Sequence, residues 1–143
     1  MALKTLNTLI KLHKRHVDVI RREMIALEEE RRLLLELTAR LKEEHASEMK
    51  LASEDPKVGN FFSNYSKQIK KRLQTIAQSV AKLDKDIEAK VEAIRAEFGE
   101  QKKFEIAREH ANKRLAMEAL HKNQQRLDEV GAQQYQKAKG TPI

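Results

Sequence analysis

The sequence predicts an all-α protein in which two long helices form an antiparallel coiled-coil hairpin, the second helix being longer and overhanging the first. Glycine and proline total only six of 143 residues, too few for folds built from many tight turns. Charged residues make up 36% and aromatic residues 4% of the chain, a composition typical of long helices. Apolar residues also recur every three or four positions in two long stretches, which one short break separates.

The first helix is predicted over about residues 2–52, in a part of the chain that lacks glycine and proline. Alternating steps of three and four residues from Leu3 to Glu48 meet apolar side chains at nine of fourteen positions. Such a spacing is the heptad seam of a coiled coil. The polar residues that interrupt it are His13, Arg31, Thr38 and His45, and the pattern ends on a fifth polar residue, Glu48.

A break is predicted over about residues 53–64. Pro56 disfavours helical backbone at the residue before it, and Gly59 tolerates a positive φ. Ser63 or Asn64 is expected to cap the N-terminus of the helix that follows.

The second helix is predicted over about residues 65–130. Seven of the eight seam positions from Ile69 to Ile94 are apolar, the clearest helical pattern in the chain. Farther on, alanines replace larger residues and the seam becomes thinner. Gly131 is expected to end the helix, with a flexible tail over residues 131–143.

Two helices joined by a short link are expected to pair antiparallel. Folding the chain about the break, with equal rise along both helices, places Leu41 opposite about Ala77 and Leu3 opposite about Leu115. The second helix is then expected to overhang after about residue 116.

The whole chain, residues 1–143, is therefore expected to form one elongated unit with a seam but no interior, and no enzymatic activity is expected of it. It contains no cysteine and no motif for a nucleotide or another cofactor. His13 and His16 lie one helical turn apart, but two imidazoles are an incomplete metal site. Because the facing segment brings Gln101 and Phe104, we expect a polar seam position, a solvated histidine and no metal.

The charge pattern argues against nucleic acid as a partner. The net charge is +7, yet basic and acidic residues are interleaved along the chain, as on the solvated flanks of a coiled coil. The longest apolar run, Leu33–Leu35, has three residues, far below the roughly 18 that a membrane span needs. We expect a soluble intracellular protein.

Both ends of the predicted hairpin carry candidates for docking. Phe61, Phe62 and Tyr65 lie in or beside the break, where they either plug the end of the seam or anchor a partner. Both interpretations hold if only one phenylalanine turns inward. At the other end, the overhang leaves Leu120 and Leu127 without a partner helix beside several cations, which favours an acidic partner surface.

Four segments, taken in their order and spacing, carry a resemblance that covers nearly the whole chain. They are LKTLNTLIKL at 3–12, NFFSNYSKQI at 60–69, EQKK at 100–103 and NQQRLDEV at 123–130. With this length and hairpin plan, the sequence resembles the flagellar export protein FliJ and its counterparts in virulence type III secretion. The resemblance implies a small antiparallel coiled coil, similar to the central stalk of rotary ATPases.

The resemblance further implies a non-catalytic stalk and chaperone component of the type III export apparatus, acting in flagellum biogenesis and motility. Its implied place is the cytoplasm, peripheral to the inner membrane through protein partners. Those partners would be the hexameric export ATPase, the cytoplasmic domain of the export gate and export chaperones. The positions that match gate contact, at the loop end, are near Tyr65, Ile69 and Leu73, and the loop aromatics Phe61 and Phe62 are further candidates for that contact. The positions that match contact with the ATPase ring, at the terminal end, are Lys11, Arg15, Arg22, Arg114, Lys122, Arg126 and Leu127.

The alternative is a homo-oligomeric coiled-coil adaptor or secretion chaperone without an ATPase partner. A self-sufficient hairpin is expected to be a monomer when free, whereas an adaptor would form a stable dimer or tetramer. The oligomeric state therefore separates the two hypotheses.

Overall fold

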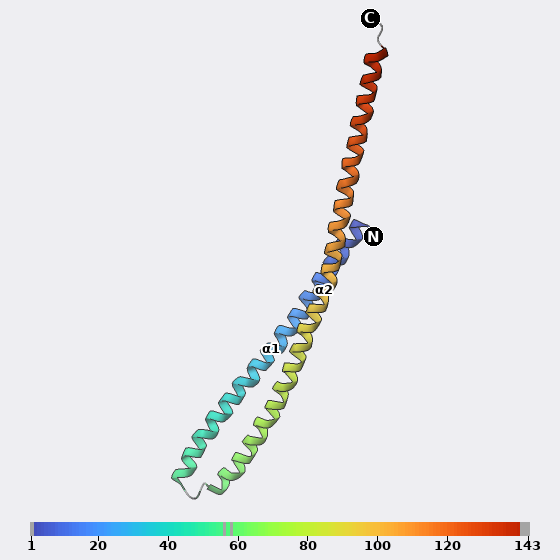
Figure 1. Ribbon diagram of the computed structural model, residues 1–143. Helices are drawn as coiled ribbons and strands as arrows, with labels where there is room; N and C mark the ends of the chain where they lie inside the picture. Colours follow the sequence, from blue (N-terminus) through green and yellow to red (C-terminus); the bar gives the residue numbers. More distant parts are fainter. Residues whose placement is uncertain (1, 56, 58, 141–143) are drawn as a thin grey trace. The chain divides into compact units, whose positions relative to one another are not determined.

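The computed structural model describes residues 2–55, 57 and 59–140, and these residues form two helices and no strand. Helix α1 spans Leu3–Glu54 and helix α2 spans Gly59–Gly140, with 52 and 82 residues respectively. The chain is thus a helical hairpin whose second helix is the longer one (Figure 1). The predicted fold class is confirmed.

The predicted break over 53–64 is wrong in its bounds, because only four residues separate α1 from α2. Ser63 and Asn64 lie inside α2 and cannot cap its N-terminus. Packing explains the difference: Phe62 and Tyr65 contact His45 of α1, so helical backbone here gains contacts that outweigh the weak helix propensity of serine and asparagine. The expectation for Pro56 lies outside the described residues.

The C-terminal end of α2 also differs from the prediction. The helix continues through Gly131 to Gly140, so the predicted flexible tail is helical from 131 to 140. A glycine that ends a helix commonly adopts a positive φ, and no described glycine does so. Lys137 and Lys139 occupy the last turn, where cations interact favourably with the helix dipole.

Contacts divide the chain into two compact units. The hairpin unit is Arg15–Glu97, and the terminal unit is Met1–Lys14 together with Phe98–Ile143. In each unit, a segment of α1 packs against a segment of α2.

The hairpin unit has its core near the connection between the helices. Leu41 of α1 is buried against Ile69 and Ile76 of α2. Partly buried apolar residues extend this core along the predicted seam, and they are Leu34, Leu37, Tyr65, Leu73 and Val80. The two-helix seam is therefore the source of stability, at roughly 1.5–3 kcal/mol for each fully buried aliphatic side chain.

The register of the hairpin unit is shifted from the predicted one. Arg31 Nε lies 2.6 Å from Asp84 Oδ1, whereas the predicted fold point would place Arg31 opposite about residue 87. Leu41 likewise packs with Ile69 and Ile76 rather than Ala77, which is exposed. The shift follows from the early start of α2.

In the terminal unit, only the first turns of α1 and the part of α2 before residue 112 contain buried residues. Leu6 and Ile10 of α1 are each 2% exposed, and Ala111 of α2 is buried. The expectation that Phe104 faces His13 is confirmed, since the two rings stack with centroids 5.4 Å apart. Leu115, the predicted partner of Leu3, is 53% exposed.

Candidate functional site: two exposed docking surfaces

The first candidate surface lies where the two helices connect, and its two phenylalanines have opposite orientations. Phe61 is 79% exposed. Phe62 is half-buried and stacks on His45 of α1, with ring centroids 5.5 Å apart. The same histidine lies 6.4 Å from the Tyr65 ring, and its Nε2 is 2.9 Å from Ser66 Oγ. One phenylalanine therefore closes the seam and the other is available to a partner.

The other positions matched to gate contact are mostly engaged within the hairpin. Ile69 is 5% exposed, and Leu73 packs half-buried against the same core. Tyr65 is half-buried beside them. Because these side chains face α1, the surface that they offer to a partner is small, and Phe61 is the most exposed candidate among them.

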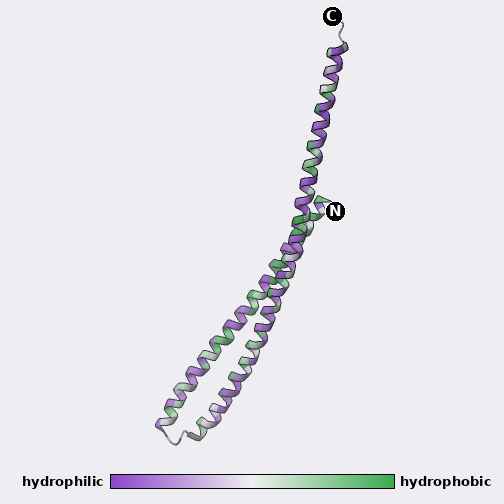
Figure 2. Ribbon diagram, in the orientation of Figure 1, coloured by the Kyte–Doolittle hydropathy of each residue, from purple (hydrophilic) through white to green (hydrophobic). Residues whose placement is uncertain are grey.

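The second candidate surface is the segment of α2 from 112 to 140, which we call the overhang. Every residue in it is exposed, and hydrophilic residues predominate along it (Figure 2). Its large exposed apolar residues are Leu115, Met117, Leu120, Leu127, Val130 and Tyr135. A helix with an exposed apolar set of this size is a candidate docking surface.

The cations matched to ATPase-ring contact are all exposed, but they are divided between the units. Arg114, Lys122 and Arg126 lie on the overhang of the terminal unit, next to Leu127, and Lys11 belongs to the same unit. Arg15 and Arg22 lie in the hairpin unit. The overhang therefore brings three of the six expected cations onto one helix with exposed apolar residues.

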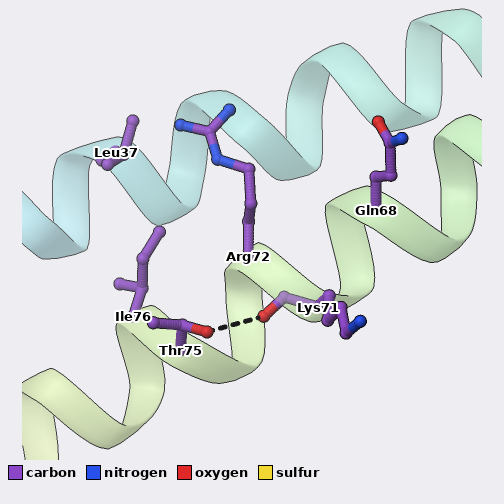
Figure 3. A pocket seen from close by; sticks show the side chains of 6 residues that line it. All are labelled: Leu37, Gln68, Lys71, Arg72, Thr75 and Ile76. Carbon is purple, nitrogen blue, oxygen red and sulfur yellow. Dashed lines mark hydrogen bonds between the residues drawn. The ribbon is translucent and has the colours of Figure 1, made fainter.

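A groove in the hairpin unit was not anticipated from the seam pattern. It has a volume of about 470 Å³ and is lined by Leu37, Gln68, Lys71, Arg72, Thr75 and Ile76. Arg72 and Gln68 extend from α2 toward α1, while Lys71 points away from α1 (Figure 3). A signal in the sequence could have found it, because residues 56–83 contain six lysines and arginines and no aspartate or glutamate.

Several other charged residues form ion pairs on the surface. Lys90 pairs with Glu23 across the hairpin, and Arg32 bridges Glu29 and Glu36 along α1. The hydrogen bond from Arg32 lowers the pKa of Glu29 below its ordinary value, and the same contact raises the pKa of Arg32. Being exposed, these pairs add little stability and mainly keep α1 solvated.

His13 and His16 of α1 contact different residues of α2. His13 stacks on Phe104 within the terminal unit, and His16 Nδ1 lies 3.5 Å from Glu97 within the hairpin unit. The predicted absence of a metal and of other cofactors stays a prediction. Neither helix, over its described residues, has a stretch long and apolar enough to cross a membrane.

Comparison of the chain with protein-family models, with curated proteins and with solved structures found no match.

Proposed function

We propose that this protein is a non-catalytic helical stalk of a type III protein export apparatus. In this role the overhang binds the hexameric export ATPase, and the connection end, with Phe61 as its anchor, contacts the export gate. Export chaperones would be further partners. The family resemblance of the sequence supports the identity of these partners.

The observation that carries the proposal is the exposure of the overhang. Residues 112–140 remain helical although none of them is buried. Tertiary packing of an amphipathic face supplies most helical stability in proteins, and Leu120 and Leu127 are 65% and 70% exposed. A partner that covers these side chains would supply the packing that the described chain lacks.

The mechanism would be selection of the assembled ATPase. A binder promotes assembly only if it binds the ring more tightly than the free subunits. A basic helix with exposed leucines can do this when its docking surface is formed by more than one subunit. Arg114, Lys122 and Arg126 would then pair with carboxylates of the ring and set its orientation.

The test measures ATP hydrolysis and ring formation by a type III export ATPase with and without this protein. We expect faster hydrolysis together with a larger hexamer fraction. A variant truncated after Ala111 should lose both effects and keep the circular dichroism of a folded hairpin. Unchanged hydrolysis and assembly, with both proteins folded, would contradict the proposal.

A homo-oligomeric adaptor or secretion chaperone is a second candidate, and the same exposed leucines favour it. A second copy of the chain could cover the overhang in a longer coiled coil. Sedimentation of the free protein separates the two: a monomer supports the stalk, and a stable dimer or tetramer that dissociates on truncation after Ala111 supports the adaptor.

A further inference from the structure

We infer that the groove between α1 and α2 in the hairpin unit is a docking site for an acidic amphipathic helix of a partner protein. This inference goes beyond the proposed function, because it concerns neither the overhang nor the Phe61 anchor and does not require an ATPase. It rests on the shape of the groove, on the chemistry of its lining and on the distribution of charge along α2.

The groove has an apolar base. Leu37 of α1 is half-buried at one wall, and Ile76 of α2, 8% exposed, lies at the bottom. The aliphatic stems of Lys71 and Arg72 extend this apolar surface, as the stems of long cationic side chains commonly do. An occupant must therefore present apolar side chains to the hairpin.

The wall that α2 contributes runs along the helix. Gln68, Arg72 and Thr75 follow one another at helical spacing on one flank, so the groove spans about two turns, or roughly 11 Å, parallel to the helix axis. An additional helix can lie along such a groove, with apolar residues at every third or fourth position facing its base.

The rim of the groove is cationic and has no internal partner. Within the described part of the chain, the side chains of Lys71 and Arg72 form no ion pair and no hydrogen bond. In contrast, Arg31 and Lys90 elsewhere on the hairpin are paired across the seam. The two free cations therefore remain available to carboxylates of an occupant.

The surface of α2 beside the groove is also positively charged. Lys67, Lys70 and Lys71 are exposed around a second hollow of α2, which Gln68 and Gln74 also line. The absence of any acidic residue over 56–83 means that no carboxylate of this segment offsets them. Such a surface attracts an acidic partner, and like-charged partners are rejected.

An acidic helix fits these features better than a lipid surface does. The cations flank an apolar groove that runs along the hairpin. Among the residues between 56 and 83 whose exposure the structure describes, Phe61 is the only large apolar residue that is strongly exposed. Membrane-bound helices, in contrast, present a broad apolar face together with their cations. The charge and the shape of the groove therefore both favour a helical protein segment as its occupant.

The experiment uses the full-length protein and a fluorescent model peptide. The peptide has about 18 residues, with leucine at every third or fourth position, glutamate on both flanks of the leucine stripe and alanine elsewhere. A matched peptide carries lysine in place of each glutamate. We expect saturable binding of the acidic peptide, seen as a rise in fluorescence anisotropy, and none of the basic peptide.

Two groove variants test the site. Reversal of both rim charges, Lys71→Glu with Arg72→Glu, should weaken binding by about tenfold or more, as expected for the loss of two exposed ion pairs and the gain of repulsion. Thr75→Trp should fill the groove and weaken binding without changing the net charge. The helical circular dichroism of both variants should match that of the unchanged protein.

The matched control reverses two cations away from the groove, Lys85→Glu with Lys102→Glu, and alters the net charge by the same amount. It should bind the acidic peptide within about twofold of the unchanged protein, since the screened field of distant charges is weak. Equal loss in the control and in the rim variant would overturn the inference, because it would show attraction by net charge alone.

Two further outcomes would overturn it. One is no saturable binding of the acidic peptide. The other is binding to vesicles of phosphatidylglycerol and phosphatidylcholine that the rim variant abolishes while peptide binding is unaffected. ATPase stimulation is measured in parallel, and the rim variant should retain it. Failure of the groove and failure of the stalk proposal are therefore distinguishable.

Discussion

Arg31 of α1 and Asp84 of α2 form an ion pair across the hairpin, with 2.6 Å between Nε and Oδ1. The pair records the register of the two helices, because the simple fold point expected from the sequence would have placed Arg31 near residue 87. Both side chains are about half exposed, so the pair is a marker of register more than a source of stability.

A double-mutant cycle tests this register. Exchanging the charges at Arg31 and Asp84 singly and together should give a coupling free energy of about 0.2–1 kcal/mol in denaturant unfolding. The control cycle combines Arg31 with Glu88. Like Asp84, Glu88 is an acidic residue of α2, and it lies close to position 87, where the partner of Arg31 was expected. Coupling with Glu88 in place of Asp84 would contradict the register described above.

The contribution of the core can be tested with two leucines of α1. Leu41→Ala removes a side chain that is 4% exposed and should lower the free energy of unfolding by about 2–4 kcal/mol. Leu33→Ala removes the same atoms from a side chain that is 51% exposed and should cost less than about 1 kcal/mol. Similar losses for both variants would argue against the observed seam.

The two neighbouring phenylalanines at the start of α2 should separate stability from binding. Phe62→Ala removes the stack on His45 and should destabilise the protein by about 1–3 kcal/mol. Phe61→Ala should change stability by no more than about 0.5 kcal/mol and weaken binding to the export gate if the proposed function holds. Thermal unfolding and a binding titration measure the two effects; the reverse assignment would refute the orientation of the pair.

Gly131 offers a direct test of where α2 ends. An added Cβ would meet no atom within 4 Å, and the backbone has no positive φ. Gly131→Ala should therefore stabilise the helix by about 0.5–1 kcal/mol and raise the helical circular dichroism. If Gly131 instead ended the helix in a left-handed conformation, the alanine would be strained and helicity would fall.

The pH dependence of α1 should depend on Glu29. Its pKa is held below the ordinary value of 4.5, first by the hydrogen bond from Arg32. A lowered pKa in the folded state means that the stabilising contribution is present above pH 4.5 and is lost as the pH falls through the folded value. Because the group is fully exposed, the effect is small.

Thermal unfolding in acid and at neutral pH checks this. The midpoint should fall slightly less on acidification in Glu29→Gln than in the unchanged protein, since the variant has no carboxylate at position 29 to protonate. Glu28→Gln serves as a neighbouring control and should behave like the unchanged protein. An equal or larger fall in Glu29→Gln would contradict the assigned cause.

Local spacing predicted the elements but not their ends. The heptad pattern correctly selected Leu6, Ile10, Leu41 and Ile69 as seam residues, because a helix with 3.6 residues per turn must bury such a stripe. The prediction from local propensity was wrong at Ser63, because serine favours the N-cap position when only the neighbouring sequence is considered. The contacts of Phe62 and Tyr65 with α1 stabilise helical backbone there, and no local rule contains that contribution.

The candidate surfaces, too, were predictable from the sequence only in part. The exposure of Leu120 and Leu127 follows from the unequal lengths of the helices and was expected. The opposite orientations of Phe61 and Phe62 were left open, because which side chain faces α1 depends on where α2 begins. The groove at Arg72 requires both helices in register, and its only trace in the sequence is the acid-free segment 56–83.

By itself, therefore, the sequence determined the helical class, the hairpin plan and the seam, since these depend on residue type and on spacing within one helix. Only the tertiary structure decided the register of Arg31 with Asp84, the start of α2, the inward turn of Phe62 and the groove beside Lys71. Each of these depends on contacts between residues far apart in the chain. The free energy of such contacts is set by packing across the seam, which local periodicity does not specify.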